Sequence, residues 1–363
     1  MTKPVKVLIV DDSALIRAAL EKQLKALPFV EIVGLAPDPF VARDILMRTS
    51  PDLILLDMEM PRMDGLTFLG KIMQFKPTPT LVVSSVTPKG SSTALACLHA
   101  GAIDVLCKPS SAYSIDQLQE QIVKWIQEVG KQGSQRMAKR QVALAKHPKP
   151  LPGHGQGNAE APTPGITTTN RVVAIGCSAG GPETLRHLFA ALPGSSPGIV
   201  IVQHMGPQFL KQMAVSLNQV TRMNVKLAED GDSVIPGRAL LAPGDIHMEL
   251  TRTGSRYSVR LKQGSTVSGH KPAVDVLFDS VAKSGGSNAM GVILTGMGND
   301  GAAGMKRMRD AGARTIAQDE DTSIVYGMPQ RAVEAGGVQD SLPLDDIPKR
   351  IVEFGSASLR HSA

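Results

Sequence analysis

The chain contains the sequence IGCSAGGPE at residues 175–183, after an apolar run at residues 172–175 and before an amphipathic segment at residues 183–191. This order predicts a strand, a tight glycine turn and a helix, with Pro182 in the first helical turn, where proline is tolerated. The flanking glycines let the backbone bend sharply and leave Ser178 at the tip of the turn. The stretch matches the G-x-S-x-G pattern of a nucleophilic serine. The first hypothesis is therefore a serine esterase or amidase.

The same glycines are also typical of the phosphate-binding turn of a dinucleotide fold. That fold requires an acidic residue at the end of the next strand. The next apolar run, residues 199–202, ends instead in Gln203, His204 and Met205. Because the carboxyl ends of parallel strands share one edge of a sheet, His204 is expected beside Ser178, where a general base belongs. The serine hypothesis is therefore favoured.

A third apolar run, residues 290–294, leads into TGMGNDG at residues 295–301 and brings Asp300 to the same edge. Ser178, His204 and Asp300 predict a nucleophile, a base and a carboxylate that orients the base. Two alternatives stay open: Asp300 could cap the helix predicted at residues 302–309, and His204 could be an ordinary packed or surface histidine. Cys177 is interpreted as a packing residue, because its side chain is expected to point away from that of Ser178.

Negative charge on the attacked carbonyl oxygen needs hydrogen-bond donors, for which backbone N–H groups are well suited. We expect these donors in the turn after Ser178, at Gly180 and Gly181. We also expect them in the loop at residues 295–298, at Met297.

The first half of the chain holds a second group of polar strand ends. Apolar runs at residues 5–10, 53–56, 80–83 and 103–107 alternate with helical patterns. They end in Asp11 with Asp12, in Asp57, in Ser84 and in Lys108. Five alternating βα units predict an α/β fold with a doubly wound parallel sheet of the flavodoxin-like type, which binds its ligands at the carboxyl ends of the strands.

These strand ends predict phosphoryl chemistry. Carboxylates gathered at one edge, here Asp11, Asp12 and Asp57, repel one another and favour a hard divalent cation, for which Mg²⁺ is the usual choice. With the metal bound, Asp57 can attack a phosphoryl donor while Lys108 neutralises the transferred oxygens. Ser84 is placed to hydrogen-bond the product. The alternative is a set of solvated acidic strand ends without a ligand.

Both halves resemble known domains. The first half resembles the receiver domain of two-component signalling, through the strand-end residues above, MPRMDG at residues 60–65 and KP at residues 108–109. The second half resembles the catalytic domain of the chemotaxis protein-glutamate methylesterases, the CheB family. The matching motifs are IGCSAGG at 175–181, QHM at 203–205, APGDIHM at 242–248, LTGMGNDG at 294–301 and YGMP at 326–329. Many members have threonine after the nucleophile, where this chain has Ala179, so we assign that position no role.

The resemblance implies a response regulator that is an enzyme. Asp57 would be phosphorylated by a sensor histidine kinase with Mg²⁺ bound at Asp11, Asp12 and Asp57, and the esterase itself would need no cofactor. The substrates would be methylated glutamates and glutamines of methyl-accepting chemoreceptors. The expected domains are a receiver at residues 1–130, a flexible linker at 131–168 and a methylesterase domain at 169–357. The last is expected to be a mainly parallel doubly wound sheet with a β-hairpin at residues 247–251 and 257–261.

Composition leaves one rival class to weigh. The net charge of +6 and the receiver resemblance also suit a regulator that binds DNA. Much of the excess charge, however, lies in residues 131–168, where proline, glycine and small polar residues indicate a solvated linker. A DNA-binding output would be a short helical module, whereas residues 171–355 alternate strands and helices. We therefore expect no nucleic-acid partner. A scaffold with a decayed site is disfavoured because all three residues Ser178, His204 and Asp300 are present.

The remaining features indicate a cytoplasmic protein. Three cysteines in 363 residues argue against a disulfide framework and for a reducing compartment. The first residues show no signal-peptide pattern, and no apolar run approaches the roughly 20 residues that span a bilayer. We expect no direct insertion into a membrane.

Overall fold

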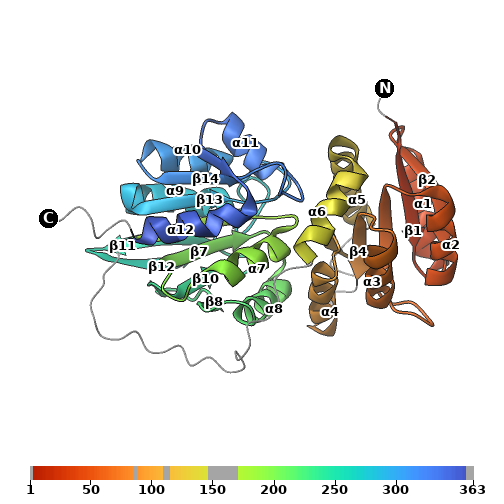
Figure 1. Cartoon of the computed structure of the whole chain (residues 1–363), viewed down its shortest axis with the longest axis horizontal. Helices are drawn as coiled ribbons and strands as arrows, with labels where there is room; N and C mark the ends of the chain where they lie inside the picture. The colour runs from red at the N-terminus through yellow and green to blue at the C-terminus, as the bar shows by residue number, and fades with distance from the viewer. Residues whose placement is uncertain (1–2, 85–87, 109–114, 146–170, 357–363) are drawn as a thin grey trace. The chain divides into compact units, whose positions relative to one another are not determined.

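The computed structural model describes residues 3–84, 88–108, 115–145 and 171–356 (Figure 1). The chain divides into two compact units, Met1–Lys146 and His147–Ala363. Among the described helices, none combines the length and the apolar character that a membrane span requires.

The first unit contains a sheet of five parallel strands in the order β2-β1-β3-β4-β5. The strands are β1 (Val5–Val10), β2 (Val30–Ala36), β3 (Leu53–Asp57), β4 (Thr80–Ser84) and β5 (Asp104–Cys107). Strands β3 and β4 are buried at every position, as their apolar runs predicted for a sheet covered on both faces. The order reverses between β1 and β3, so the edge where ligands bind in such folds lies at Asp11 and Asp57.

Helices alternate with these strands, as predicted. They are α1 (Ala14–Lys25), α2 (Pro39–Thr49), α3 (Gly65–Phe75), α4 (Pro88–His99) and α5 (Ile115–Gln132); a further helix, α6 (Ser134–Ala145), follows α5 directly. Short polar side chains begin three of them: Ser13, Asp38 and Asp64 accept hydrogen bonds from the first free backbone N–H groups of α1, α2 and α3.

Helix α6 differs from the expectation that a linker starts at residue 131. Its buried residues include Met137, Gln141 and Leu144, which recur at helical spacing. The Gln141 side chain donates to the carbonyl oxygen of Gly101 at 2.5 Å, which ties α6 to the receiver-like unit. Basic residues lie among these positions, namely the exposed Arg136 and Lys139 and the buried Arg140, and they obscure the apolar face in the sequence. The rest of the predicted linker, residues 146–168, lies outside the described residues.

The second unit contains a sheet of seven strands in the order β15-β14-β13-β6-β7-β10-β8, with all pairings parallel. The strands are β6 (Val172–Cys177), β7 (Gly198–Gln203), β8 (Asn224–Leu227), β10 (Arg238–Leu241), β13 (Ala289–Ile293), β14 (Arg314–Gln318) and β15 (Asp340–Leu342). Strand β6 is followed in the chain by its neighbour β7 on one side, and only much later by β13 on the other. The switch point, where such folds bind their ligands, therefore lies at the end of β6.

A separate antiparallel sheet has the order β11-β12-β9. It is built from β9 (Ser233–Val234), β11 (His247–Thr253) and β12 (Arg256–Lys262). Strands β11 and β12 form the predicted hairpin, and Gly254 in the connecting turn has a φ of 60° that favours glycine. The expected α/β fold with a mainly parallel sheet and a hairpin is confirmed.

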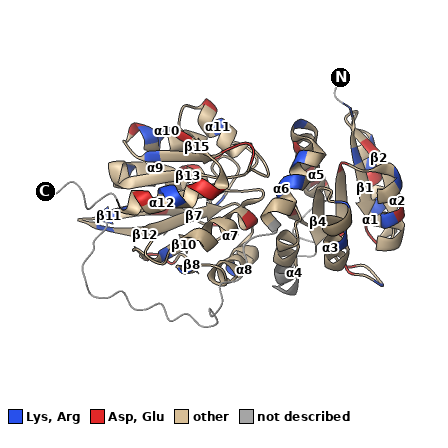
Figure 2. Cartoon of the chain, viewed as in Figure 1, with Lys and Arg blue, Asp and Glu red and all other residues tan. Residues whose placement is uncertain are grey.

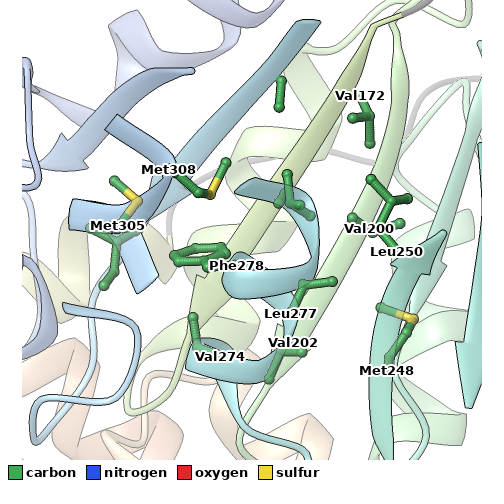
Figure 3. Packing of buried hydrophobic residues seen from close by; sticks show 14 of the residues in the cluster. Val172, Val200, Val202, Met248, Leu250, Val274, Leu277, Phe278, Met305 and Met308 are labelled. Atoms are coloured by element: carbon green, nitrogen blue, oxygen red, sulfur yellow. The ribbon is translucent and has the colours of Figure 1, made fainter. Parts of the chain in front are cut away.

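The helices of the second unit cover its parallel sheet. They are α7 (Gly181–Ala191), α8 (Pro207–Asn218), α9 (Val274–Gly285), α10 (Ala302–Asp310), α11 (Met328–Glu334) and α12 (Ile347–Ser356). Helix α9 packs against α10, β6 and the hairpin strand β11, and Phe278 of α9 is fully buried in the cluster between them (Figure 3). Val274, at the start of α9, lies in the same cluster, so the core holds the end of α9 that faces the switch point.

Hydrogen–deuterium exchange can test whether residues 134–145 are helical in solution. Their amides should exchange slowly, because an amide in a packed helix exchanges only when the helix opens. Met137→Ala removes a fully buried side chain and should speed this exchange, since such changes cost about 2–5 kcal/mol. Lys139→Ala, on the exposed side of α6, is the matched control and should change nothing. Exchange at the rate of an unstructured peptide in the unaltered chain would contradict the packed helix.

Candidate active site

The three residues predicted to form a triad follow three neighbouring strands. Ser178 follows β6, His204 follows β7, and Asp300 lies in the loop between β13 and α10. Backbone hydrogen bonds continue past the strand ends: Ser178 N–H donates to Thr295 O at 3.0 Å, and His204 N–H donates to Cys177 O at 3.1 Å. Ser178 is thus held between the two neighbouring loops at the switch point.

The turn after Ser178 is fixed by close contacts. Gly180 has a φ of 74°, and Gly181 N–H donates to Ser178 O at 2.8 Å to close the turn. The Gln203 side chain donates from Nε2 to the same carbonyl oxygen at 2.9 Å. A Cβ on Gly181 would lie 1.9 Å from Gln203 Oε1, so this contact requires glycine. The turn leaves Ser178 half-buried at the start of α7.

Cys177 packs into the interior. Its side chain is fully buried, and Sγ lies 3.7 Å from the carbonyl oxygen of Val202. Burial raises the pKa of the Cys177 thiol far above its usual value, which keeps the sulfur protonated and poorly nucleophilic. The interpretation of Cys177 as a packing residue is confirmed.

His204 and Asp300 form a hydrogen-bonded pair. Nε2 of His204 lies 2.8 Å from Oδ2 of Asp300. The carboxylate also accepts the N–H groups of Val274, at 2.7 Å to Oδ2, and Asp275, at 2.9 Å to Oδ1. Asp300 therefore caps the preceding helix α9, in place of the alternative that it caps the helix after it. The first turn of a helix favours negative charge, so this position suits a carboxylate.

These contacts keep Asp300 ionised. Burial alone would raise the pKa of Asp300, but His204 and the N–H groups of Asp275 and Val274 lower it below the ordinary aspartate value. A carboxylate that accepts from Nε2 fixes the His204 tautomer with its proton on Nε2. Nδ1 of His204 then carries the free lone pair, and it is buried without a hydrogen-bond partner in the described part of the chain. Nδ1 is therefore the ring nitrogen of His204 that is left available as an acceptor.

The loop after β13 lies against Ser178. A Cβ on Gly296 would lie 2.9 Å from Cβ of Ser178. The Thr295 hydroxyl donates to Ala179 O at 2.9 Å and accepts from Val325 N–H at 2.9 Å, which fastens this loop to the turn. Within the described residues, no hydrogen bond joins Ser178 Oγ to His204; such contacts are often looser before substrate binds.

The expected oxyanion donors separate into two groups. The N–H of Gly181 already donates to Ser178 O, so Gly181 shapes the turn and is not a free donor, which corrects the expectation. The N–H groups of Gly180 and Met297 donate to no other residue that the structure describes. These two stay candidates.

One side chain near the site was not predicted to act there. The ring of His270 stacks on the ring of His204, with centroids 3.7 Å apart and planes 3° apart. The two residues are far apart in the sequence, and nothing in their local patterns signals the contact. The supporting roles of the Gln203 side chain and of Thr295 were likewise not foreseen, although both lie in motifs singled out from the sequence.

The second predicted site lies in the receiver-like unit. Asp11, Asp12 and Asp57 offer oxygen atoms within 4.8 Å of one another. Lys108 Nζ lies 2.6 Å from Oδ1 of Asp57 and 3.5 Å from Oδ2 of Asp11. Ser84 is buried at the end of the adjacent strand β4, and its carbonyl oxygen accepts Lys108 N–H at 2.9 Å. The structure therefore brings the predicted residues together; Pro109 lies outside the described residues.

The electrostatics of this second site suit a cation. Burial raises the pKa of both Asp11 and Asp57, and Lys108 offsets only part of this effect. Oδ2 of Asp57 is buried and has no hydrogen-bond partner among the described residues. A hard divalent cation uses such oxygen atoms and relieves the repulsion between the carboxylates. The donor set fits Mg²⁺.

Both units match families of known proteins. Residues 173–351 match the family model described as CheB methylesterase, and residues 7–122 match that of the response regulator receiver domain. A solved structure, the CheB methylesterase catalytic domain of Thermotoga maritima, is 38% identical and has a TM-score of 0.50. It covers 51% of this chain and 98% of that one.

Two full-length relatives extend the match to both units. The chain is 49% identical to protein-glutamate methylesterase/protein-glutamine glutaminase 4 of Anaeromyxobacter dehalogenans (strain 2CP-C), covering 96% of this chain and 95% of that one. It is 45% identical to the protein-glutamate methylesterase/protein-glutamine glutaminase of Escherichia coli (strain K12), covering 97% of both. The chain therefore belongs to the CheB family of protein-glutamate methylesterases/protein-glutamine glutaminases, in which a receiver domain and a methylesterase domain share one polypeptide.

Proposed function

We propose that this protein hydrolyses the methyl esters of glutamate side chains on methyl-accepting chemoreceptors, deamidates receptor glutamines, and is activated by phosphorylation of its receiver domain. The observation that carries the proposal is the His204–Asp300 pair beside Ser178. An ionised carboxylate holds one ring nitrogen and leaves the other without a partner among the described residues, while the backbone N–H of His204 is bonded to Cys177 O, one residue before the serine.

The reaction follows a serine hydrolase course. Ser178 Oγ attacks the ester carbonyl as its proton passes to Nδ1 of His204. The bond to the methoxy oxygen then breaks, and the same proton goes to that oxygen, so methanol leaves. Water attacks the acyl-enzyme with His204 again as base, which releases glutamate and restores Ser178. Asp300 stabilises the imidazolium that forms at each step.

The two ring nitrogens of His204 have other roles here than in most serine hydrolases. In the usual triad Nδ1 faces the carboxylate and Nε2 faces the serine, whereas here Nε2 faces Asp300 and the nitrogens exchange roles. For a glutamine substrate the leaving group is ammonia, which takes its proton from His204 in the same way. Gly180 N–H and Met297 N–H are our proposed donors to the oxyanion.

The receiver domain would carry the signal. Asp57 would accept a phosphoryl group from the phosphohistidine of a sensor histidine kinase. Asp11, Asp12 and Asp57 would hold Mg²⁺, which neutralises charge on the phosphoryl oxygens when bound. Lys108 would move from Asp57 to the new phosphate oxygens, and Ser84 would hydrogen-bond them. Phosphorylation then raises esterase activity by shifting the population of states of the chain.

We place the protein in the cytoplasm, where a kinase and the receptor helices are both accessible. Its cysteines are all free thiols, which suits a reducing compartment. The DNA-binding alternative is disfavoured, because the output unit is an α/β fold rather than a short helical module. Lys and Arg are also interspersed with Asp and Glu over both units (Figure 2), whereas a nucleic-acid site gathers basic residues on one face.

Substitution of the nucleophile tests the esterase mechanism. Ser178→Ala should lower turnover in a methanol-release assay by on the order of ten-thousand-fold, the scale seen when a triad loses a member. Cys177→Ala is the matched control one residue away and should keep most of the activity. An active Ser178→Ala enzyme together with an inactive but folded Cys177→Ala enzyme would refute the serine mechanism.

Phosphoryl labelling tests the receiver site. A small phosphodonor with Mg²⁺ should label Asp57 and raise methanol release, because Asp57 is the carboxylate that Lys108 contacts most closely. Asp57→Asn and removal of Mg²⁺ with a chelator should each abolish both effects. Glu31→Gln, at an exposed position of β2, is the control and should leave them intact. Acid-labile phosphate that persists on the Asp57→Asn chain would show that another residue is the acceptor.

A further inference from the structure

The stacked pair of His204 and His270 is not explained by the mechanism above. That mechanism uses only the edge of the His204 ring, where Nε2 meets Asp300 and Nδ1 is free. His270 instead covers one face of the ring, at a centroid separation of 3.7 Å with the planes 3° apart. Rings that are parallel at this distance cannot hydrogen-bond to each other, because their N–H groups and lone pairs lie in the ring planes. The contact therefore acts through stacking.

The loop that presents His270 has a defined turn. It joins β12 to α9, and Val267 and His270 exchange both backbone hydrogen bonds, at 3.0 and 2.9 Å. The two residues between them, Ser268 and Gly269, have φ angles of 53° and 80°. Positive φ at both central positions is the geometry of a tight hairpin turn, and serine adopts it less readily than glycine. The turn therefore fixes the direction in which the His270 side chain leaves the loop.

A buried histidine fastens the base of this loop. His247, at the start of β11, donates from Nε2 to Ser265 O at 2.9 Å and accepts Ala273 N–H on Nδ1 at 3.2 Å. It therefore joins the residues on either side of the turn. The Ser268 hydroxyl adds a hydrogen bond to Asp275 at 3.3 Å. His247 lies in a motif that the sequence analysis singled out without a role.

The loop and the triad carboxylate share one attachment point. Ala273 bonds to His247, while the next two residues, Val274 and Asp275, donate their N–H groups to Asp300. The start of α9 thus fixes Asp300 on one side and the His270 loop on the other. Asp300 and His270 both contact the ring of His204. The same three residues, Ala273, Val274 and Asp275, therefore hold Asp300 and the loop that carries His270.

We propose that His270 is a positioning residue for the esterase reaction. Its ring blocks rotation of the His204 imidazole, so that Nε2 stays directed at Asp300 and Nδ1 at the Ser178 turn, and His247 is the anchor that holds it there. This inference rests on the proposed function. Its physical basis is that small errors in the orientation of a base are costly, since a displacement of about 1 Å can lower a rate on the order of a hundredfold.

Kinetics of His270 variants in the full-length chain separate positioning from general stability. His270→Ala should lower kcat on the order of ten- to a hundredfold with little change in KM, because the ring orients the base and binds no substrate. His270→Phe keeps a flat ring of similar size and should restore most of kcat. His187→Ala is the matched control, because His187 is half-buried on α7 and bonds Asp345 instead; its activity should be unchanged.

A spectroscopic readout completes the test without relying on turnover. The Nε2 proton of His204 in the hydrogen bond to Asp300 should give a low-field NMR signal in the unaltered chain and in His270→Phe. It should broaden or vanish in His270→Ala. An unchanged kcat in His270→Ala, equal damage from Phe and Ala, or a signal indifferent to both variants would overturn the inference. If the unaltered chain releases no methanol at all, the proposed esterase function fails, and the NMR comparison still decides the role of His270.

Discussion

The buried carboxylate of Asp300 is the group on which the candidate active site depends. Its oxygens accept two N–H groups at the start of α9, and one of them meets His204. It thereby connects the loop after β13 to α9 and to the end of β7. A buried charge without such partners would be neutralised by protonation, so the bonds that keep Asp300 ionised also give the imidazole its tautomer and direction. The core around Phe278 holds α9 where these bonds can form.

The two units place their chemistry at equivalent points of a doubly wound sheet but balance charge in opposite ways. Asp300 is fully hydrogen-bonded, and its pKa is lowered. Asp11 and Asp57 have raised pKa values, and one oxygen of Asp57 has no partner in the described residues. The first arrangement already satisfies its carboxylate with hydrogen bonds from His204, Val274 and Asp275. The second gains from a cation and from a phosphoryl group, which suits a signal input that is loaded and unloaded.

The sequence predicted the features that depend on local pattern. Buried strands showed as apolar runs, and the polar residues just after them, such as Ser178 and Asp57, had to share an edge. Strand β2 (Val30–Ala36) and helix α6 were not identified, because half-exposed or strongly charged residues dilute their periodicity. Contacts between distant segments left no such signal. Three features depend on loop geometry that only the folded chain defines: the occupied N–H of Gly181, the unpartnered Nδ1 of His204 and the stack of His270 on His204.

We propose that one serine, Ser178, is the nucleophile and that His204, held by Asp300, activates it. The most direct measurement is mass spectrometry of the intact chain after reaction with a fluorophosphonate, followed by fragmentation of the modified peptide. We expect a single adduct, located on Ser178 and not on the adjacent Cys177, that forms far more slowly in His204→Ala. An adduct on Cys177 or elsewhere, or labelling of Ser178 that is equally fast without His204, would contradict it.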